Sequence, residues 1–250
     1  GFRAISMIDD LVRKAANEYQ SKTSYVVRPL LLQDSDTGMI DKWLKFTQKQ
    51  MPDCWHNLDE TLVFSNTKPD RKYYASMRLP YPLEEGPMDC YNELVNVLYS
   101  PEERRKLEWC IGSIVSGDSK RIQKFAVLYG SGGTGKGTML DIIKMMFSGY
   151  YATFEAKNLG SKSDSFSLEA FKDNPLVAID PDGDLSNIED NTRLNSLVAH
   201  EEMLVNEKFK SRYSMKFNAF LLMGTNRPVR ITDAKSGIIR RLIDISPTGI

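Results

Sequence analysis

One stretch of the chain, residues 124–147, restricts the possible folds more than any other. It opens with a short apolar run, Phe125 to Tyr129, whose length and residue types predict a buried strand. The next six residues, Gly130 to Gly135, include four glycines. From Met139 to Phe147, apolar side chains recur at helical spacing and form one broad apolar face. A strand, a glycine-rich turn and a helix in this order, with Gly-Lys at the end of the turn, form the phosphate-binding loop motif in its required setting.

The residue types of this turn suit the binding of a polyphosphate. Glycines let the backbone adopt positive φ and approach an anion closely, so that several N–H groups can point at it. The helix that follows directs its positive dipole end and its unpaired amides to the same place. We expect Lys136 to face solvent and ligand, and to bind the terminal phosphates as a point charge. The candidate nucleotide contacts are Gly130, Ser131, Gly132, Gly133, Thr134, Gly135, Lys136, Gly137 and Thr138.

One position departs from the motif. A Ser or Thr that ligates Mg²⁺ normally follows the lysine, whereas this chain has Gly137 and then Thr138. The sequence Gly-Lys-Gly-Thr resembles the variant found in adenylate kinases, so we expect nucleotide binding to survive the change. The metal would then depend on Thr138, on water or on a carboxylate elsewhere. An ordinary glycine-rich turn with a solvated lysine is the alternative, and the agreement of spacing, flanking elements and lysine argues against it.

Composition narrows the class of protein without naming a partner. The 250 residues are 41% hydrophobic and 26% charged, which is typical of a globular chain long enough for one large or two modest domains. Lys plus Arg equals Asp plus Glu, at 33 each, so any contact with nucleic acid requires a local basic patch.

Cysteines and apolar runs bear on the location of the protein. Cys54, Cys90 and Cys110 match neither a zinc pattern nor a disulfide framework, which favours a reducing cytosol. No apolar run has membrane-spanning length and the N-terminus does not resemble a signal peptide, so we expect a cytoplasmic protein with no membrane partner. The chain begins with Gly and stops soon after a predicted strand, which suggests a piece of a larger protein.

Residues 1–118 predict a largely helical accessory or oligomerisation region. Apolar residues at helical spacing predict helices at about 5–19, 36–50 and 89–98. Another helix is expected after Ser100, where Glu103 completes a capping box, and it should end near Gly117. Segments 61–65 and 73–79 are rich in β-forming residues and predict a possible hairpin.

The run from Pro175 to Asp180 predicts an apolar strand that ends in a carboxylate. In nucleotide hydrolases an acid at the end of such a strand holds Mg²⁺ or orients water. Asp182 and Asp184 follow directly. The alternative is a core strand that runs into an acidic turn, because Pro-Asp-Gly favours turns in any protein. The preceding phosphate loop favours the functional interpretation.

Three further features follow toward the C-terminus. Residues 203–217 predict two short strands around a basic turn with Lys208, Lys210 and Arg212, which could equally be a solvated turn. Residues 219–226 predict an apolar strand that ends in a polar Asn. Residues 242–245 predict a last strand, preceded by two arginines.

Taken in order, these motifs resemble those of the superfamily III helicases. The matching segments are Gly130 to Thr138, Leu-Val-Ala-Ile-Asp180, Val205-Asn-Glu-Lys-Phe-Lys210, Gly-Thr-Asn226-Arg-Pro228 and Ile-Arg240-Arg241-Leu. The most similar type is the helicase part of phage and poxvirus primase–helicases, and the resemblance covers roughly residues 88–247. It implies an AAA+-like α/β P-loop NTPase core with a central, mostly parallel sheet at residues 119–250, truncated at its C-terminus.

The resemblance also implies an activity and partners. Members of this class hydrolyse ATP with Mg²⁺ and assemble as rings, usually hexameric, that thread one DNA strand. The resemblance further implies a primase or polymerase domain, fused to the helicase or working beside it. The hairpin before the Asn strand lines the pore, so Lys208 and Lys210, with Arg212, would grip the phosphate backbone.

Site roles follow from the same resemblance. Lys136 would be the phosphate-loop lysine, and Asn226 would be the sensor that positions water against the γ-phosphate. Arg240 or Arg241 would reach the nucleotide of a neighbouring subunit as the arginine finger. The family places two adjacent acids where this chain has only one, so either Asp180 or Asp182 would be the catalytic acid. Thr138 and Asp180 are the candidate metal ligands.

The sequence is also compatible with two other functions. A small-molecule nucleotide kinase is suggested by Gly-Lys-Gly-Thr, but such an enzyme requires an arginine-rich lid that the following motifs do not supply. A nucleotide-gated assembly module with weak turnover is suggested by the missing hydroxyl at Gly137.

Overall fold

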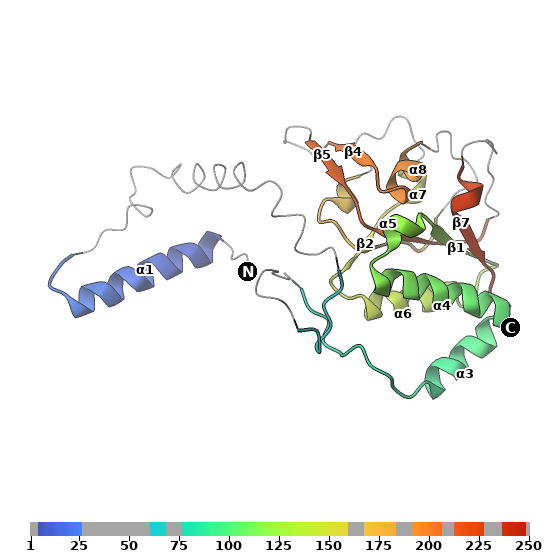
Figure 1. Ribbon diagram of the computed structural model, residues 1–250, viewed down its shortest axis with the longest axis horizontal. Helices are drawn as coiled ribbons and strands as arrows, with labels where there is room; N and C mark the ends of the chain where they lie inside the picture. The colour runs from blue at the N-terminus through green and yellow to red at the C-terminus, as the bar shows by residue number, and fades with distance from the viewer. Residues whose placement is uncertain are drawn as a thin grey trace. The chain divides into compact units, whose positions relative to one another are not determined.

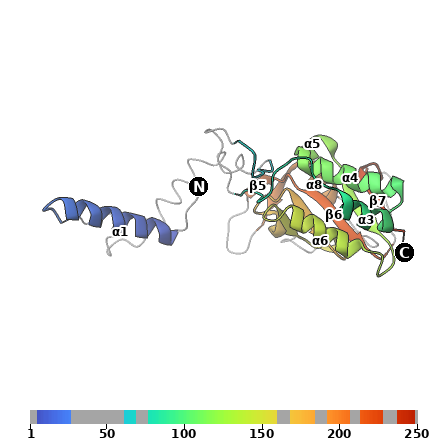
Figure 2. The ribbon, with the colours of Figure 1, turned by 90° about the horizontal axis from the view of Figure 1, so that it is seen from below.

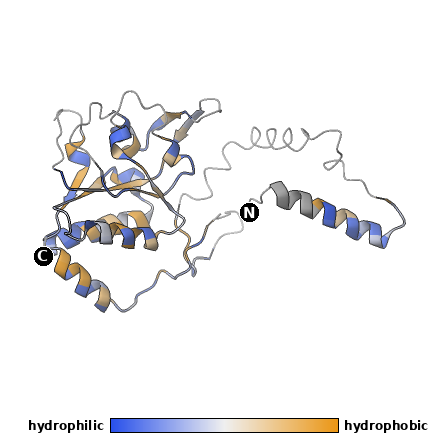
Figure 3. Ribbon diagram, turned by 180° about the vertical axis from the view of Figure 1, so that it is seen from behind, coloured by the Kyte–Doolittle hydropathy of each residue, from blue (hydrophilic) through white to orange (hydrophobic). Residues whose placement is uncertain are grey.

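A computed structural model describes residues 5–26, 61–68, 77–159, 168–183, 192–206, 213–227 and 237–248. By its contacts the chain divides into two compact units, residues 1–58 with 69–76, and residues 59–68 with 77–250. The first unit contains α1 (Ile5–Lys22), which confirms the helix predicted from residue 5. None of the α1 side chains described, from Val12 onward, is buried, and Figure 3 shows that part of its ribbon as mostly hydrophilic. The helix predicted at residues 36–50 lies outside the described residues.

The second unit contains the remaining elements (Figure 1). Its helices are α3 (Asp89–Leu98), α4 (Pro101–Ser116), α5 (Ser119–Ile122), α6 (Lys136–Met146), α7 (Ala156–Leu159), η3 (Glu169–Phe171), α8 (Thr192–Val198) and η4 (Ile239–Arg241). Its strands are β1 (Phe125–Tyr129), β2 (Tyr151–Thr153), β3 (Val177–Asp180), β4 (Glu202–Val205), β5 (Tyr213–Lys216), β6 (Phe220–Thr225) and β7 (Leu242–Ile245).

Five strands form one sheet in the order β2-β3-β6-β1-β7, and every pairing in it is parallel. The α/β class with a mostly parallel central sheet is therefore confirmed. Strands β3 and β6 are buried along their whole length, as expected for a sheet covered on both faces. The predicted pair of strands around residues 203–217 is also confirmed, because β4 and β5 form a separate antiparallel pair.

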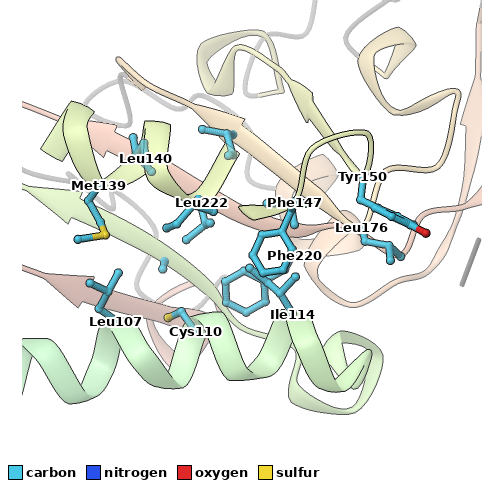
Figure 4. Close-up of a cluster of buried hydrophobic side chains, with 14 of the residues drawn as sticks. Leu107, Cys110, Ile114, Met139, Leu140, Phe147, Tyr150, Leu176, Phe220 and Leu222 are labelled. Atoms are coloured by element: carbon cyan, nitrogen blue, oxygen red, sulfur yellow. The ribbon is translucent and has the colours of Figure 1, made fainter. Parts of the chain in front are cut away.

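One face of the sheet packs against α4 and α6. Side chains of Leu107, Cys110 and Ile114 on α4 share a buried cluster with Met139 and Leu140 on α6. Figure 4 shows these side chains pointing toward one another, with those of β6 between them. Because α4 shares this core, residues 101–116 pack with the sheet, and the sequence-based domain boundary after residue 118 stays a prediction.

The opposite face packs against α7, η3, α8 and the β4–β5 pair. Strand alternation sends Phe125 and Val127 of β1 to this side, whereas Ala126 and Leu128 belong to the first cluster. Figure 2, seen from below, shows α6, α4 and α3 on the side nearest the viewer. The two faces together bury the first four residues of β1, and the strand leads directly into the glycine-rich loop.

Local signals set the bounds of α4. Ser100 accepts a hydrogen bond at its Oγ from the Glu103 amide (3.3 Å), and Gly117 ends the helix with φ 69°. The Glu103 carboxylate, however, accepts hydrogen bonds from the Lys106 ammonium and the Ser246 amide. The hydroxyl half of the predicted capping box is therefore formed, and the carboxylate holds the chain beyond β7 instead.

The strand predicted at residues 61–65 is not formed. The carbonyl oxygens of Phe64 and Ser65 accept hydrogen bonds from the guanidinium of Arg78, so they do not form a strand ladder. Isolated backbone bonds, such as Leu79 N–H to Val63 O at 2.7 Å, hold this segment instead. Part of the second predicted strand, residues 73–76, lies outside the described residues.

Candidate functional site

Three loops meet at the carboxyl ends of β1, β6 and β3. Tyr129 at the end of β1 pairs with Thr225 at the end of β6, and Asp180 at the end of β3 pairs with Met223. The Gly130 amide then donates to the Thr225 carbonyl at 3.2 Å, so the glycine-rich loop leaves the sheet beside Asn226. In open parallel sheets, ligands bind beyond the carboxyl ends of the strands. The predicted glycine, Asp and Asn segments are thus on one edge of the sheet.

The turn after β3 is fastened to β6 by a close backbone approach. The Gly183 amide donates to the Gly224 carbonyl at 2.7 Å. A Cβ on Gly224 would come within 2.8 Å of the Pro181 carbonyl oxygen, so only glycine fits there without a shift. This contact fixes the acidic turn against the strand that carries Asn226.

The glycine-rich loop has the backbone conformation that its sequence predicts. Gly133 and Gly135 both have φ of +82°, a region that L side chains rarely adopt. A Cβ on Gly130 would come within 2.9 Å of Thr134 Oγ1, whose hydroxyl donates to the Ser131 carbonyl at 2.9 Å. Helix α6 begins at Lys136, so its unpaired N-terminal amides lie at the end of this loop.

Lys136 is buried, with only 8% of its surface exposed, so the expectation of a solvent-facing lysine is wrong. Its ammonium donates to the carbonyls of Gly130 and Ser131, each at 2.7 Å. The loop turns its own carbonyls toward the lysine, and this encloses the side chain. Burial lowers the pKa of Lys136, and the nearby charge of Asp182 acts in the opposite direction.

Asp180 is buried, and both of its oxygens hold the surrounding backbone. Oδ2 accepts from the Ala156 amide at 2.6 Å, and Oδ1 accepts from the Asp182 amide at 3.2 Å. Burial raises the pKa of Asp180 above its usual value, although these two hydrogen bonds oppose the shift. Asp182 is exposed, so the turn presents one buried and one exposed carboxyl group, and the charge of the exposed one acts on Lys136.

The carboxylates of this site could hold a divalent cation only together with the phosphate oxygens of a bound nucleotide. Within the described ranges, no group of three or more His, Cys, Asp or Glu side chains could hold a metal ion by itself. Mg²⁺ at phosphates is commonly held by one or two carboxylates together with phosphate oxygens. Asp180 and Asp182 match that set, and the predicted ligand Thr138 is exposed near the start of α6.

Arg240 and Arg241 lie at the other end of β1. Strand β7 starts directly after them, and its first residue, Leu242, pairs with Phe125 at the start of β1. Arg240 is exposed and its carbonyl accepts from Lys124, while Arg241 donates to the Asn195 carbonyl at 3.3 Å. The two arginines are therefore separated from Lys136 of the same chain by the length of the strand.

Three predicted site residues, Lys208, Lys210 and Arg212, lie outside the described residues, as does Asp184 beyond the acidic turn. Asn226 is exposed directly after β6. The flanking Thr225 is buried, and its hydroxyl accepts from the Arg227 amide at 3.1 Å, which closes the turn below Asn226.

The end of α3 and residues 246–248 pack around the glycine-rich loop, an arrangement that no sequence motif indicates. Leu98 of α3 lies against Gly135, and Pro247 lies beside Gly130. The Thr248 amide donates to the Leu98 carbonyl at 2.8 Å, and the Ser246 amide donates to Glu103 Oε2 at 2.7 Å. These contacts join segments far apart in the sequence, and only Glu103 carried a local signal.

Comparison with known proteins places this fold among solved structures. Residues 128–241 match a family described as "Family of unknown function (DUF5906)". No curated protein matches the chain. The apo structure of the C-terminal region of NrS-1, residues 305–718, is similar at a TM-score of 0.50 and 20% identity, over 75% of this chain.

Two further apo structures of that region give TM-scores of 0.48 and 0.49, at 19% and 18% identity, over 74% and 82% of this chain. The chain spans about half the length of the matched regions, namely 47%, 46% and 52%. At these identities the likeness concerns the fold. In the described part of the chain, no helix combines the length and apolarity that a membrane span requires.

Proposed function

We propose that this chain is an AAA+-like P-loop ATPase that drives single-stranded DNA through a ring, as a translocase or helicase of a viral or phage replication protein. One observation supports this function most strongly. The carboxyl ends of three adjacent parallel strands carry a glycine-rich loop with a lysine, an acidic turn and an Asn. Hydrolysis of a nucleoside triphosphate requires this combination of an anion-binding loop, a carboxylate and a residue that orients water.

The nucleotide would be bound by the loop and the start of α6. Backbone amides of residues 131–137, including the N-terminus of α6, would supply donors for phosphate oxygens. Lys136 already lies within the loop, hydrogen-bonded to two of its carbonyls, and a γ-phosphate would take the place of these acceptors. Anion binding would therefore exchange these two carbonyl bonds of Lys136 for bonds to phosphate oxygens.

Hydrolysis would use the acidic turn and Asn226. The buried Asp180 fixes the backbone of the turn through the Asp182 amide, and the exposed Asp182 contributes its charge near Lys136. Asn226, exposed at the end of β6, would orient the attacking water. When bound, Mg²⁺ held by Asp180 and Asp182 would neutralise charge on the β- and γ-phosphates.

A ring would complete each site from two chains. Arg240 and Arg241 lie at the opposite end of β1 from Lys136, so they would act on the nucleotide of a neighbouring subunit. The basic segment between β4 and β5 would contact the phosphate backbone of the DNA without reading bases.

ATP turnover with and without single-stranded DNA tests this function. We expect release of inorganic phosphate, accelerated by a single-stranded oligonucleotide, and loss of turnover in Arg240→Ala/Arg241→Ala. Phosphoryl transfer from ATP to a nucleoside monophosphate would instead identify a kinase. ATP-dependent assembly with negligible turnover would identify a gating module.

A further inference from the structure

Three residues, Phe217 to Ala219, connect the two sheets of the second unit. Strand β5 of the hairpin ends at Lys216, and β6 of the parallel sheet begins at Phe220. This connector therefore joins the base of the hairpin to the strand that ends beside Asn226. The backbone path from β5 to β6 is therefore only three residues long.

Two side chains from distant parts of the chain hold the connector backbone. Nδ1 of His200 donates to the Phe217 carbonyl at 2.5 Å, and the Asn218 amide donates to Asn174 Oδ1 at 3.0 Å. His200 and Asn174 both have positive φ, 55° and 48°. Asn and His adopt this region more readily than most residues other than glycine, but it is still uncommon for them, and residues in it are often found at functional positions.

The second nitrogen of His200 extends the connection to β1. Because Nδ1 donates to a carbonyl, Nε2 of the neutral ring accepts, and Ser119 Oγ lies 3.1 Å from it. Ser119 opens α5, the short helix just before β1. His200 is only 5% exposed, so these bonds are made away from water.

The ring of Phe217 is held as firmly as its carbonyl. Its centroid lies 5.6 Å from that of Phe171, which in turn lies 5.4 Å from that of Phe154. Phe217 is 1% exposed and Ala219 is 3% exposed. The connector is thus fixed by buried rings and by two hydrogen bonds that belong to neither sheet.

We propose that His200 and Asn174 are positioning residues that keep the connector rigid, so that DNA binding at the hairpin alters the position of Asn226 at the nucleotide edge. This inference rests on the proposed ATPase and translocase function. It assigns to the two side chains a role in coupling DNA to turnover, and no part in binding or hydrolysing ATP.

Matched substitutions separate the two bonds of His200. The amide nitrogen of Asn takes the place of His Nδ1, so His200→Asn can keep the bond to Phe217 and loses the bond to Ser119. The amide group of Gln takes the place of Nε2, so His200→Gln keeps Ser119 and loses Phe217. At the other position, Asn174→Asp keeps an acceptor, whereas Asn174→Gly tolerates positive φ and removes the acceptor.

The experiment compares ATP turnover of the full chain and of each variant with and without a single-stranded oligonucleotide, with thermal unfolding measured in parallel. We expect His200→Gln and Asn174→Gly to keep basal turnover and to lose roughly threefold to tenfold of the stimulation by DNA, the equivalent of one hydrogen bond. His200→Asn and Asn174→Asp should retain the stimulation of the parent.

The outcomes separate this inference from the proposed function. If the parent is stimulated and His200→Gln and Asn174→Gly keep its full stimulation, even with a lowered melting temperature, the two residues are only structural and the inference is wrong. A parent with no ATP turnover overturns the proposed function, and the inference with it. Loss of stimulation in the two conservative variants as well would contradict the assignment to the individual bonds.

Discussion

Leu98 at the end of α3 lies so close to Gly135 that a Cβ on the glycine would come within 2.6 Å of Leu98 Cδ2. Gly133 has the same φ of +82°, yet a Cβ there would meet nothing within 4 Å. The two glycines therefore form a matched pair. Backbone conformation restricts both positions, and contact with Leu98 restricts only Gly135. The contact ties a helix outside the sheet to the end of the candidate nucleotide loop.

The first prediction uses this pair. We expect Gly133→Ala to lower the free energy of unfolding by roughly 1–2 kcal/mol, the usual cost of placing an L-amino acid with a Cβ in the left-handed backbone region. Gly135→Ala should cost more, because Leu98 must also move. The excess should vanish in a Leu98→Ala background, as measured by denaturant unfolding in a double-mutant cycle. Equal costs for the two glycines in the parent would show that Leu98 yields freely.

The second prediction concerns Lys136. Replacing this lysine with Ala should reduce ATP turnover by roughly 100-fold or more, the typical effect of losing one donor to a charged transition state. Because the side chain is buried, Lys136→Met is the matched control for lost packing. Both variants should lose turnover, and Lys136→Met should unfold closer to the parent. Parent-like turnover in either variant would remove the basis for the nucleotide site.

The third prediction separates the carboxylates. Asp180→Asn should raise the Mg²⁺ concentration needed for hydrolysis or stop hydrolysis, because Asp180 holds the acidic turn and is a candidate ligand. Asp184→Asn should have little effect, and Asp182→Asn tests the second candidate acid. Turnover would be titrated with Mg²⁺ for each variant. Equal losses at positions 180 and 184 would mean that Asp180 is not the critical group.

The fourth prediction concerns pH. Burial lowers the pKa of His200 below its ordinary value of 6.5, and Lys120 and Arg241 act in the same direction against its hydrogen bonds. The unfolded chain therefore binds a proton first, so this contribution to stability is complete above pH 6.5 and is lost as the pH falls through the folded pKa. Between these two pKa values, each fall of one pH unit should lower the free energy of unfolding by up to about 1.4 kcal/mol.

The comparison for this pH effect is His200→Asn, which keeps a donor to Phe217 and cannot be protonated. Urea unfolding of both proteins between pH 5 and pH 8 should give a free-energy difference that shrinks as the pH falls. A difference that does not change with pH would contradict a buried, neutral His200.

The fifth prediction concerns Lys208 and Lys210. The double variant Lys208→Ala/Lys210→Ala should weaken single-stranded DNA binding for all sequences and flatten its salt dependence, by roughly 0.7 in slope for each lost phosphate contact. ATP binding should remain. DNA affinity and unwinding would be measured at several salt concentrations in a ring-forming protein. Unchanged affinity would identify the segment as a solvated turn.

Much of the second unit could be predicted because its signals are local. Ser100 and Gly117 set the limits of α4, and the apolar run at residues 125–129 forms β1 with the expected bounds. Parallel strands of this fold bring their carboxyl ends together, so Asp180 and Asn226 could be assigned to one edge from their positions after strands.

The remaining features depend on contacts between distant segments. The burial of Lys136 follows from the path of the loop carbonyls, which the glycine spacing does not specify. The bond between Asn174 and Asn218 spans 44 residues, and neither residue stands out in the sequence. Arg78 takes the carbonyls that a strand at residues 61–65 would have used, although the β-forming residues there favour a strand.

The positions of the two ends of β1 predict how ATP turnover should depend on protein concentration. The carboxyl end of the strand leads to Lys136, and its amino end lies beside the segment that carries Arg240 and Arg241. Under the proposed function, one chain holds halves of two different sites and cannot complete either. Turnover per chain should then rise with concentration and vanish on dilution while every chain stays folded. Each active site would lie at an interface between two chains, so the number of active sites would equal the number of such interfaces and not the number of folded chains.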